Sequence, residues 1–218
     1  MRHRIIFFTE NTKKYEEVAN FLASNTETYP NIILEYFKPL TAIPEIQSLD
    51  REEIVRAKLI SIALVTQSYE VKPAEDTETV WIVAEDTSLT IEKLGGFPGP
   101  FVKFFLESMP LNRICEISTE SAANNIVSVG AIKLLPSGFF RMDDISNFKY
   151  FEGVIKGVIS STPRGSNGFG FDPVFIPTDG ENQTMKTNAE FTPAEKNNIN
   201  PRTKAFAELF KWVVEASG

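Results

Sequence analysis

Two adjacent acids, Glu85 and Asp86, follow an apolar run at residues 80–84 and precede a glycine- and proline-rich stretch at 95–101. An apolar run rich in β-branched residues predicts a buried strand. Open α/β sheets bind their ligands beyond the carboxyl ends of strands, and buried carboxylates are costly unless they are paired or bind a cation. The pattern therefore predicts a magnesium site after this strand. The alternative is a solvated turn.

A polar segment at residues 9–14 lies between an expected strand and an expected helix. The first turn of a helix offers free backbone N–H groups and the positive end of the helix dipole, which together favour an anion. Thr9 and Asn11 add side-chain donors, and Lys14 adds a positive charge. The segment has no glycine, so it is not a P-loop. The alternative is an ordinary capped helix.

A third segment, Gly165 to Pro173, combines glycines with two aromatic residues and an acid. Phe169 or Phe171 could stack on a flat base, and Asp172 could accept a hydrogen bond from a ring N–H. The alternative is that both phenylalanines belong to the core. Lys196 and Arg202 follow around an expected helix cap, where the alternative is that both are solvated.

The composition excludes several classes of protein. The chain has 218 residues with a formal net charge of −7, which argues against polynucleotide binding but not against one phosphate ligand held by local lysines. A single cysteine, Cys115, excludes an intramolecular disulfide framework and fits a reducing compartment, so we expect a cytoplasmic protein. No apolar stretch approaches membrane-spanning length, and Cys115 is expected to pack as a small hydrophobe.

Hydrophobic periodicity and capping signals predict an α/β protein. Strands are expected at 5–8, 32–36, 80–84, 126–135, 139–142, 150–159 and 171–176, and helices at 13–22, from Asp50 onward, at 101–109, after Thr192 and after Asn200. Asp50 with Glu53, and Thr192 with Glu195, are capping-box patterns. We expect one domain over residues 1–218, with a β-rich lobe at roughly 124–160.

Four motifs occur in order along the chain. They are Thr9-x-Asn11-x-x-Lys14-x-x-Glu17, then Glu85-Asp86-Thr87-x-Leu89 with Leu94-Gly95-Gly96-x-Pro98-Gly99-Pro100, then Gly168-Phe169-Gly170-Phe171-Asp172-Pro173-x-Phe175, and last Ala189-Glu190 through Glu195-Lys196-Asn197. In this order they resemble the inosine triphosphate pyrophosphatase family, the HAM1-like nucleotidases. The resemblance runs from residue 5 to the last helix.

The resemblance implies an elongated mixed sheet with helices, two lobes flanking a nucleotide cleft, and a homodimer. It also implies magnesium-dependent hydrolysis of non-standard purine triphosphates (ITP, dITP, XTP) to monophosphate and pyrophosphate, with Mn²⁺ as the alternative ion. Carried over by position, the catalytic residues are Asp86 and Glu85, and the metal ligands are Glu45 and Asp86. The substrate-binding residues are Thr9, Asn11, Lys14, Lys58, Lys103, Phe169, Phe171, Asp172, Lys196 and Arg202.

One departure from the family affects base recognition. The base-reading Ser-His-Arg of the family is replaced by Asn200-Pro201-Arg202. Proline cannot donate a hydrogen bond, so one donor to the 6-oxo group of the purine is lost, and we expect relaxed base selectivity. Two alternatives are a Maf-like pyrophosphatase that acts on other altered nucleotides and a non-catalytic nucleotide-binding protein. The retained acids and lysines argue against the non-catalytic alternative.

Overall fold

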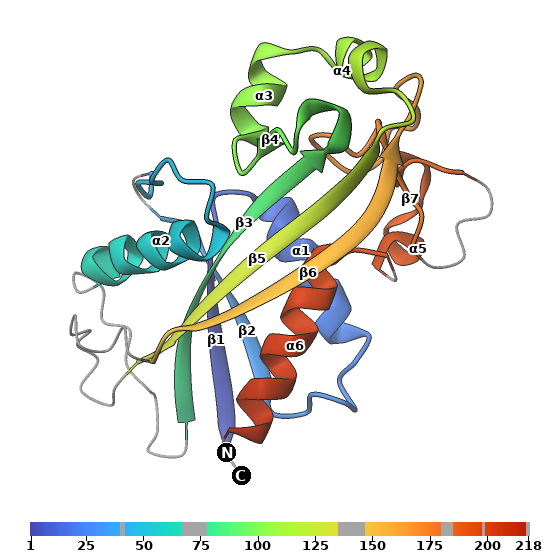
Figure 1. Ribbon diagram of the computed structural model, residues 1–218. Helices are drawn as coiled ribbons and strands as arrows, with labels where there is room; N and C mark the ends of the chain where they lie inside the picture. The colour runs from blue at the N-terminus through green and yellow to red at the C-terminus, as the bar shows by residue number, and fades with distance from the viewer. Residues whose placement is uncertain (40–41, 67–77, 135–146, 180–184, 198, 217–218) are drawn as a thin grey trace. The chain divides into compact units, whose positions relative to one another are not determined.

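The computed structural model describes residues 1–39, 42–66, 78–134, 147–179, 185–197 and 199–216 (Figure 1). Contacts within the chain divide it into two compact units. Unit 1 consists of residues 1–86, 128–151 and 205–218, and unit 2 consists of residues 87–127 and 152–204.

The strands of the described residues form a seven-stranded mixed sheet in the order β2-β1-β3-β5-β6-β7, with β4 paired to β3. They are β1 (Arg2–Phe8), β2 (Ile32–Phe37), β3 (Glu78–Ile91), β4 (Pro98–Gly99), β5 (Ala122–Lys133), β6 (Lys149–Ile159) and β7 (Phe175–Pro177). The helices are α1 (Thr12–Ala23), α2 (Arg51–Thr66), α3 (Val102–Ser108), α4 (Leu111–Ser118), α5 (Pro193–Asn197) and α6 (Pro201–Glu215), with the 3₁₀ turns η1 (Glu92–Leu94) and η3 (Asn188–Glu190). The predicted α/β class with a mixed sheet is confirmed.

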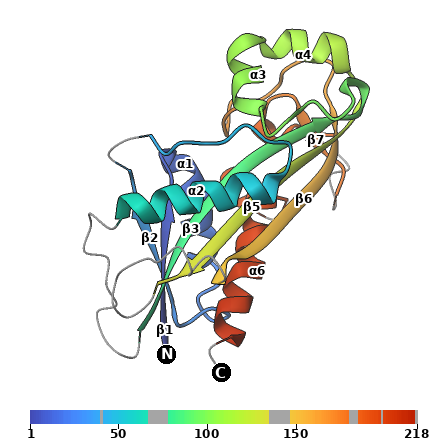
Figure 2. The same cartoon turned by 60° about the vertical axis from the view of Figure 1, so that its left-hand side comes forward.

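In unit 1, strand β1 is apolar on both of its faces because helices cover both. Ile6 and Phe8 share a core cluster with Val55 and Leu59 of α2. Figure 2 shows α2 lying across β1 and β3. Phe7 points to the opposite face, where its ring centroid lies 5.0 Å from that of Phe206 in α6. Successive side chains of β1 therefore pack alternately against the helix on one face and the helix on the other, as is typical of parallel strands buried on both sides.

Unit 2 has its own core. Leu89 and Ile91 of β3 pack with Val102 and Phe105 of α3, and with Ile114 and Cys115 of α4 among others. Cys115 is buried and free, as expected of a small hydrophobe.

Most of the predicted helices begin where a capping residue was identified. The Oδ1 atom of Asp50 accepts hydrogen bonds from the backbone N–H groups of Glu52 and Glu53 at the start of α2. Thr192 and Glu195 form the predicted reciprocal box at α5. The expected box at α2 is incomplete, because the carboxylate of Glu53 accepts a hydrogen bond from the Ser48 hydroxyl.

Two expected strands differ from the structure. Strand β3 does not end at the acids but continues to Ile91, because Ser88, Leu89 and Ile91 are buried and its last residues pair with β4. The strand expected at 171–176 is a strand only from Phe175, since residues 171–174 form a turn in which the backbone N–H groups of Val174 and Phe175 bond to the carbonyl of Phe171.

Further differences concern the middle of the chain and helix α4. Within the expected β-rich lobe at roughly 124–160, the described residues contain parts of β5 and β6, and both strands belong to the seven-stranded sheet. The strand expected at 139–142 lies outside the described residues, and α4 was not expected. In the described part of the chain, no helix is long and apolar enough to cross a membrane.

Candidate functional site

The first turn of α1 in unit 1 is built as the sequence predicts. The Thr9 hydroxyl accepts the backbone N–H of Asn11 at 3.2 Å, and Asn11 Oδ1 accepts that of Lys13 at 3.0 Å. Asn11 is thus the N-cap of α1, and it orients the first turn so that the N–H groups and the dipole of a twelve-residue helix are available to an anion.

Glu85 lies near the carboxyl end of the parallel pair β1 and β3, where it contacts one lysine of α1 and one lysine of α2. The register of β1 and β3 pairs Phe7 with Val83, which brings the residues after β1 beside Glu85. Lys14 Nζ lies 2.8 Å from Glu85 Oε1, and Lys58 Nζ of α2 donates to the Glu85 carbonyl at 3.0 Å. Lys58 also pairs with Glu45 at 2.5 Å. The carboxylate of Glu85 is 1 % exposed, so its charge is compensated by the lysine beside it.

Asp86 is the acid whose environment is most perturbed. Burial raises the pKa of its carboxyl from 3.8 to about 6, against the opposing effect of Lys58 and Lys14 and with a further raising effect of Glu45 and Glu85. Its Oδ2 atom is buried and has no hydrogen-bond partner among the described residues. A carboxylate that is desolvated, unpartnered and surrounded by charged groups is typical of a functional site. The residues of this unit 1 cluster are Lys14, Glu45, Lys58, Glu85 and Asp86.

The unit 1 cluster fits a divalent cation only together with a ligand. No three Asp, Glu, His or Cys side chains of the described residues are close enough to hold a metal ion by themselves. Mg²⁺ is usually bound through one or two carboxylates plus substrate phosphates. The orphaned oxygen of Asp86, with Glu45 within electrostatic range, matches that donor set.

A second cluster, in unit 2, surrounds one aromatic ring. Lys196 Nζ lies 5.2 Å from the centroid of the Phe169 ring, and the guanidinium carbon of Arg202 lies 5.8 Å from it. Phe169 is half-buried, whereas Lys196 and Arg202 are buried. An aromatic ring flanked by two cations can stack on a flat, electron-rich ligand and bond to its oxygens. This unit 2 cluster consists of Phe169, Asp172, Asn188, Lys196 and Arg202.

The loop that carries Phe169 is held firmly to the segment 187–191. The backbone N–H of Asn167 bonds to the Ala189 carbonyl at 3.0 Å, and its side chain bonds to the Phe191 carbonyl at 2.9 Å. Arg164 pairs with Glu190, whose carboxylate also accepts the Thr187 N–H, and these bonds hold the pKa of Glu190 below its usual range. These hydrogen bonds and the ion pair fix the glycine-rich loop to the segment 187–191.

Two of the predicted residues, Phe171 and Lys103, lie outside both clusters and the first turn of α1, and Pro201 occupies the position of the missing histidine. Phe171 lies in the unit 2 core against Phe175, which favours a packing role. Lys103 is exposed on α3 and forms no ion pair or hydrogen bond with the described residues. Pro201 opens α6, where Asn200 Oδ1 caps the N–H of Arg202 at 2.9 Å.

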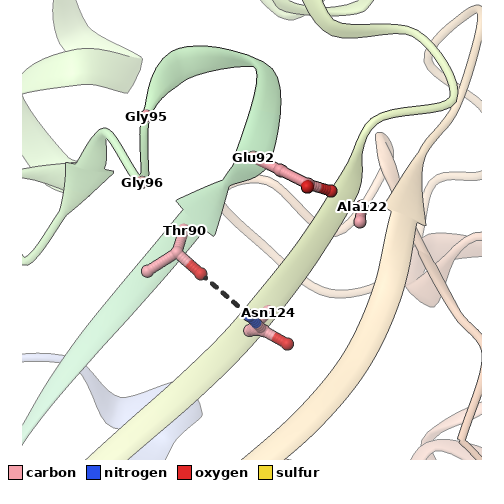
Figure 3. A pocket seen from close by; sticks show the side chains of 6 residues that line it. All are labelled: Thr90, Glu92, Gly95, Gly96, Ala122 and Asn124. Atoms are coloured by element: carbon pink, nitrogen blue, oxygen red, sulfur yellow. Dashed lines mark hydrogen bonds between the residues drawn. The ribbon is translucent and has the colours of Figure 1, made fainter.

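A hollow of about 400 Å³ also lies in unit 2, but it contains none of the predicted residues (Figure 3). Its walls are Thr90, Glu92, Gly95, Gly96, Ala122 and Asn124. The Asn124 side chain donates to the Thr90 hydroxyl at 3.1 Å. Glu92 is the one charged residue of this lining, so the hollow does not suit a phosphate.

Sequence reasoning missed two residues of the unit 2 cluster and its surroundings. Arg202 Nη2 donates to the hydroxyl of Thr87 at 3.3 Å, and Asn188 donates to Asp172 at 3.3 Å. Thr87 belongs to one of the quoted motifs but was assigned no role there, and Asn188 is next to the motif residue Ala189. Their partners are distant in sequence, so spacing alone does not reveal them.

A model of the Ham1 family matches residues 5–212. A "dITP/XTP pyrophosphatase" of Pyrobaculum aerophilum is 32% identical, with 96% of this chain and 96% of the relative covered. "Inosine triphosphate pyrophosphatase 1" of Trypanosoma cruzi is 33% identical over 95% of this chain and 90% of the relative. The solved structure of a HAM1 protein from Coxiella burnetii has the same fold, with a TM-score of 0.68, 22% identity, and 99% and 100% of the two chains covered.

Proposed function

Because this chain belongs to the Ham1 family, we propose that it is an enzyme that hydrolyses non-standard purine nucleoside triphosphates, such as ITP, dITP and XTP, to the monophosphate and pyrophosphate. Relatives that match nearly the whole chain are named dITP/XTP pyrophosphatase and inosine triphosphate pyrophosphatase. The observation that carries the proposal is the unit 1 cluster, in which two lysines and a helix N-terminus lie beside a buried carboxylate with an unpartnered oxygen.

In this proposal the triphosphate binds to the first turn of α1. Its negative charge is favoured there by the backbone N–H groups and by Lys14 and Lys58. Lys14 is paired with Glu85 in the structure, so a phosphate oxygen would exchange for that carboxylate as the partner of the ammonium group. Glu85 therefore keeps Lys14 oriented before the substrate arrives.

Asp86 and Glu45 are the residues that would hold a divalent cation, with Mg²⁺ proposed and Mn²⁺ as the alternative. When bound, the ion supplies neutralisation of the charge that develops on the phosphates. Asp86 orients the attacking water, since a carboxylate with a pKa of about 6 is largely ionised at neutral pH and can accept a proton from that water. Lys14 and Lys58 bind the phosphates that leave as pyrophosphate.

The unit 2 cluster takes the base. Phe169 stacks on the purine, and Lys196 and Arg202 donate to its oxygen atoms. Pro201 offers no donor, so one hydrogen bond to a 6-oxo group is missing from this chain. The preference for ITP over ATP is therefore reduced, while Arg202 maintains part of it. The homodimer remains a prediction of the same family resemblance, and the cytoplasmic location remains a prediction from the composition.

A pyrophosphate-release assay on ITP, XTP, dUTP, ATP and GTP, with Mg²⁺ and with EDTA, tests the proposal. We expect turnover of ITP and XTP that EDTA abolishes. Fastest turnover of dUTP would favour a Maf-like activity on other altered nucleotides. Binding of ITP without release of pyrophosphate would favour a non-catalytic nucleotide-binding protein.

A further inference from the structure

Asn188, at the start of η3 in unit 2, is a buried amide that takes no direct part in the proposed binding of the nucleotide. Its side chain is 1 % exposed, and its Nδ2 donates to Asp172 Oδ1 at 3.3 Å. Its Oδ1 is buried and unpartnered among the described residues. Only the nitrogen of the amide can donate to a carboxylate, so the orientation of the amide is fixed by Asp172.

The carboxylate that Asn188 contacts is engaged on both of its oxygens. Asp172 Oδ2 accepts the backbone N–H of Phe169 at 2.8 Å and the ammonium group of Lys196 at 2.9 Å. Asp172 is 5 % exposed. A Cβ atom at Gly168 would lie 2.1 Å from Oδ2, so the carboxylate fits against the loop only because that residue is glycine.

From these contacts we propose that Asn188 is a positioning residue that acts on base recognition through Asp172. Asn188 holds one oxygen of the carboxylate, which directs the other oxygen to Phe169 and Lys196. Lys196 is thereby kept 5.2 Å from the centroid of the Phe169 ring, where its ammonium group can meet a base stacked on that ring. The proposal rests on the proposed function of the unit 2 cluster, and it replaces the expectation that Asp172 itself accepts from a ring N–H.

A residue that merely fills space would not have these properties. Burying an amide with one unsatisfied oxygen costs free energy, and an apolar side chain of the same size would fill the position without that cost. An amide suits this position because it donates a hydrogen bond to Asp172 without a positive charge. The negative charge of Asp172 therefore stays available to Lys196. A cation in its place would compete with Lys196 for the carboxylate.

The test compares Asn188→Leu and Asn188→Asp with the wild-type protein, and it uses Asn125→Leu as the matched control. Asn125 in β5 is also a buried asparagine of unit 2 with an unpartnered Oδ1, but it does not contact Asp172. The first readout is the NMR chemical shift of the Phe169 amide proton in the protein without nucleotide. The second is KM and kcat for ITP between pH 6 and pH 8.

In Asn188→Leu we expect an upfield shift of the Phe169 amide proton and an increase of KM for ITP of up to about tenfold, with kcat changed less than about twofold. In Asn188→Asp, two carboxylates lie next to each other beside Lys196, and Arg202 lies near the same Phe169 ring. KM is then raised at pH 8 and returns toward the wild-type value at pH 6, because a shared proton restores a donor to Asp172. Asn125→Leu should change neither readout.

An unmoved Phe169 amide proton in folded Asn188→Asp at pH 8 would overturn the proposal. A KM for ITP at pH 8 equal to that of wild type in either folded variant would overturn it too. Equal effects in Asn125→Leu would overturn it as well, since the loss would then reflect general core damage. If the wild-type protein does not hydrolyse ITP, the proposed function fails. The Phe169 shift and its dependence on pH in Asn188→Asp still decide whether Asn188 positions Asp172.

Discussion

At the scale of single residues, the sequence predicted which side chains belong to the candidate site but not which side chains contact one another. Glu85, Asp86 and Lys14 were predicted as site residues from their types and from the strand and the helix beside them. That Lys14 pairs with Glu85 depends on the register between β1 and β3, which are about seventy residues apart in the chain. The contact of Asn188 with Asp172 was missed for the same reason, since it depends on how two loops meet.

Asp86→Asn should abolish most turnover and at the same time stabilise the protein without ligand. The wild-type carboxylate is ionised at pH 7 although its pKa is raised from 3.8 to about 6, so its charge disfavours the folded state. A neutral amide removes that cost, and we expect a gain on the order of 1–3 kcal/mol at pH 7 that shrinks as the pH falls toward 4. Urea unfolding and pyrophosphate release measure the two effects.

The exposed acid Glu92 provides the control for that substitution, and Glu92→Gln should alter neither activity nor stability. Unchanged activity in Asp86→Asn would contradict the catalytic assignment of Asp86. A free energy of unfolding lower in Asp86→Asn than in wild type would contradict the inference that the buried, unpartnered charge of Asp86 destabilises the folded state.

Pro201→His should sharpen the preference for ITP over ATP, and Arg202→Ala should remove most of what the wild type has. Histidine restores a donor that a 6-oxo group accepts and a 6-amino group does not, and one hydrogen bond contributes roughly 0.5–1.5 kcal/mol. Both changes are read as the ratio of kcat/KM for the two nucleotides. The same ratio in all three proteins would mean that the base is read by other residues.

At the scale of elements, capping signals predicted where helices begin, and apolar runs predicted most strands but failed at residues 171–174. The starts of α1, α2, α5 and α6 were predicted because a capping side chain acts within three residues of itself. Residues 171–174 were wrongly predicted as part of the strand that begins at Phe175, because Phe171, Val174 and Phe175 are all apolar. They are buried by a turn at a spacing of three and four residues rather than by alternation.

Asn11→Ala should lower both stability and affinity for the triphosphate. The substitution removes the cap of α1, which costs about 1 kcal/mol, and it also disorders the N–H groups proposed to bind phosphate. KM for ITP should rise, whereas Asp50→Ala, which uncaps α2, should cost similar stability with little change of KM. Thermal unfolding and steady-state kinetics measure the pair. Equal KM values in the two variants would exclude α1 as the anion site.

At the scale of the whole molecule, the sequence predicted the α/β class and the order of most elements. The family resemblance implied two lobes, but the sequence did not reveal which segments form the two compact units, because each unit is assembled from segments far apart in the sequence. Pairing of β1 with both β2 and β3 is a long-range property that hydrophobic periodicity does not encode.

At the scale of the whole molecule, His3 should contribute less to the stability of the folded state as the pH decreases below about 6.5. This histidine is 3 % exposed, its Nδ1 lies 2.7 Å from the Thr79 hydroxyl, and burial, the amino terminus and Lys133 hold its pKa below 6.5. The unfolded state therefore binds the proton first, and the contribution of neutral His3 is lost as the pH falls from 6.5 through the pKa of the folded protein.

His3→Gln should flatten the pH dependence of the unfolding free energy in that window relative to wild type. Because His3 is the chain's one histidine, its titration can be followed directly by NMR. A pKa of His3 at or above 6.5 in the folded protein would refute this account.

The division of the chain has a consequence for its biosynthesis. The backbone passes from one unit to the other four times, and α6, whose Phe206, Leu209 and Phe210 are fully buried in unit 1, is translated after all of unit 2. On the ribosome, the N-terminal strands of unit 1 must therefore wait with one face uncovered while more than a hundred further residues emerge. Proteins that fold from the N-terminus as they are made avoid such a delay. We therefore expect folding during synthesis to benefit from chaperones that shield these apolar strands until α6 has emerged.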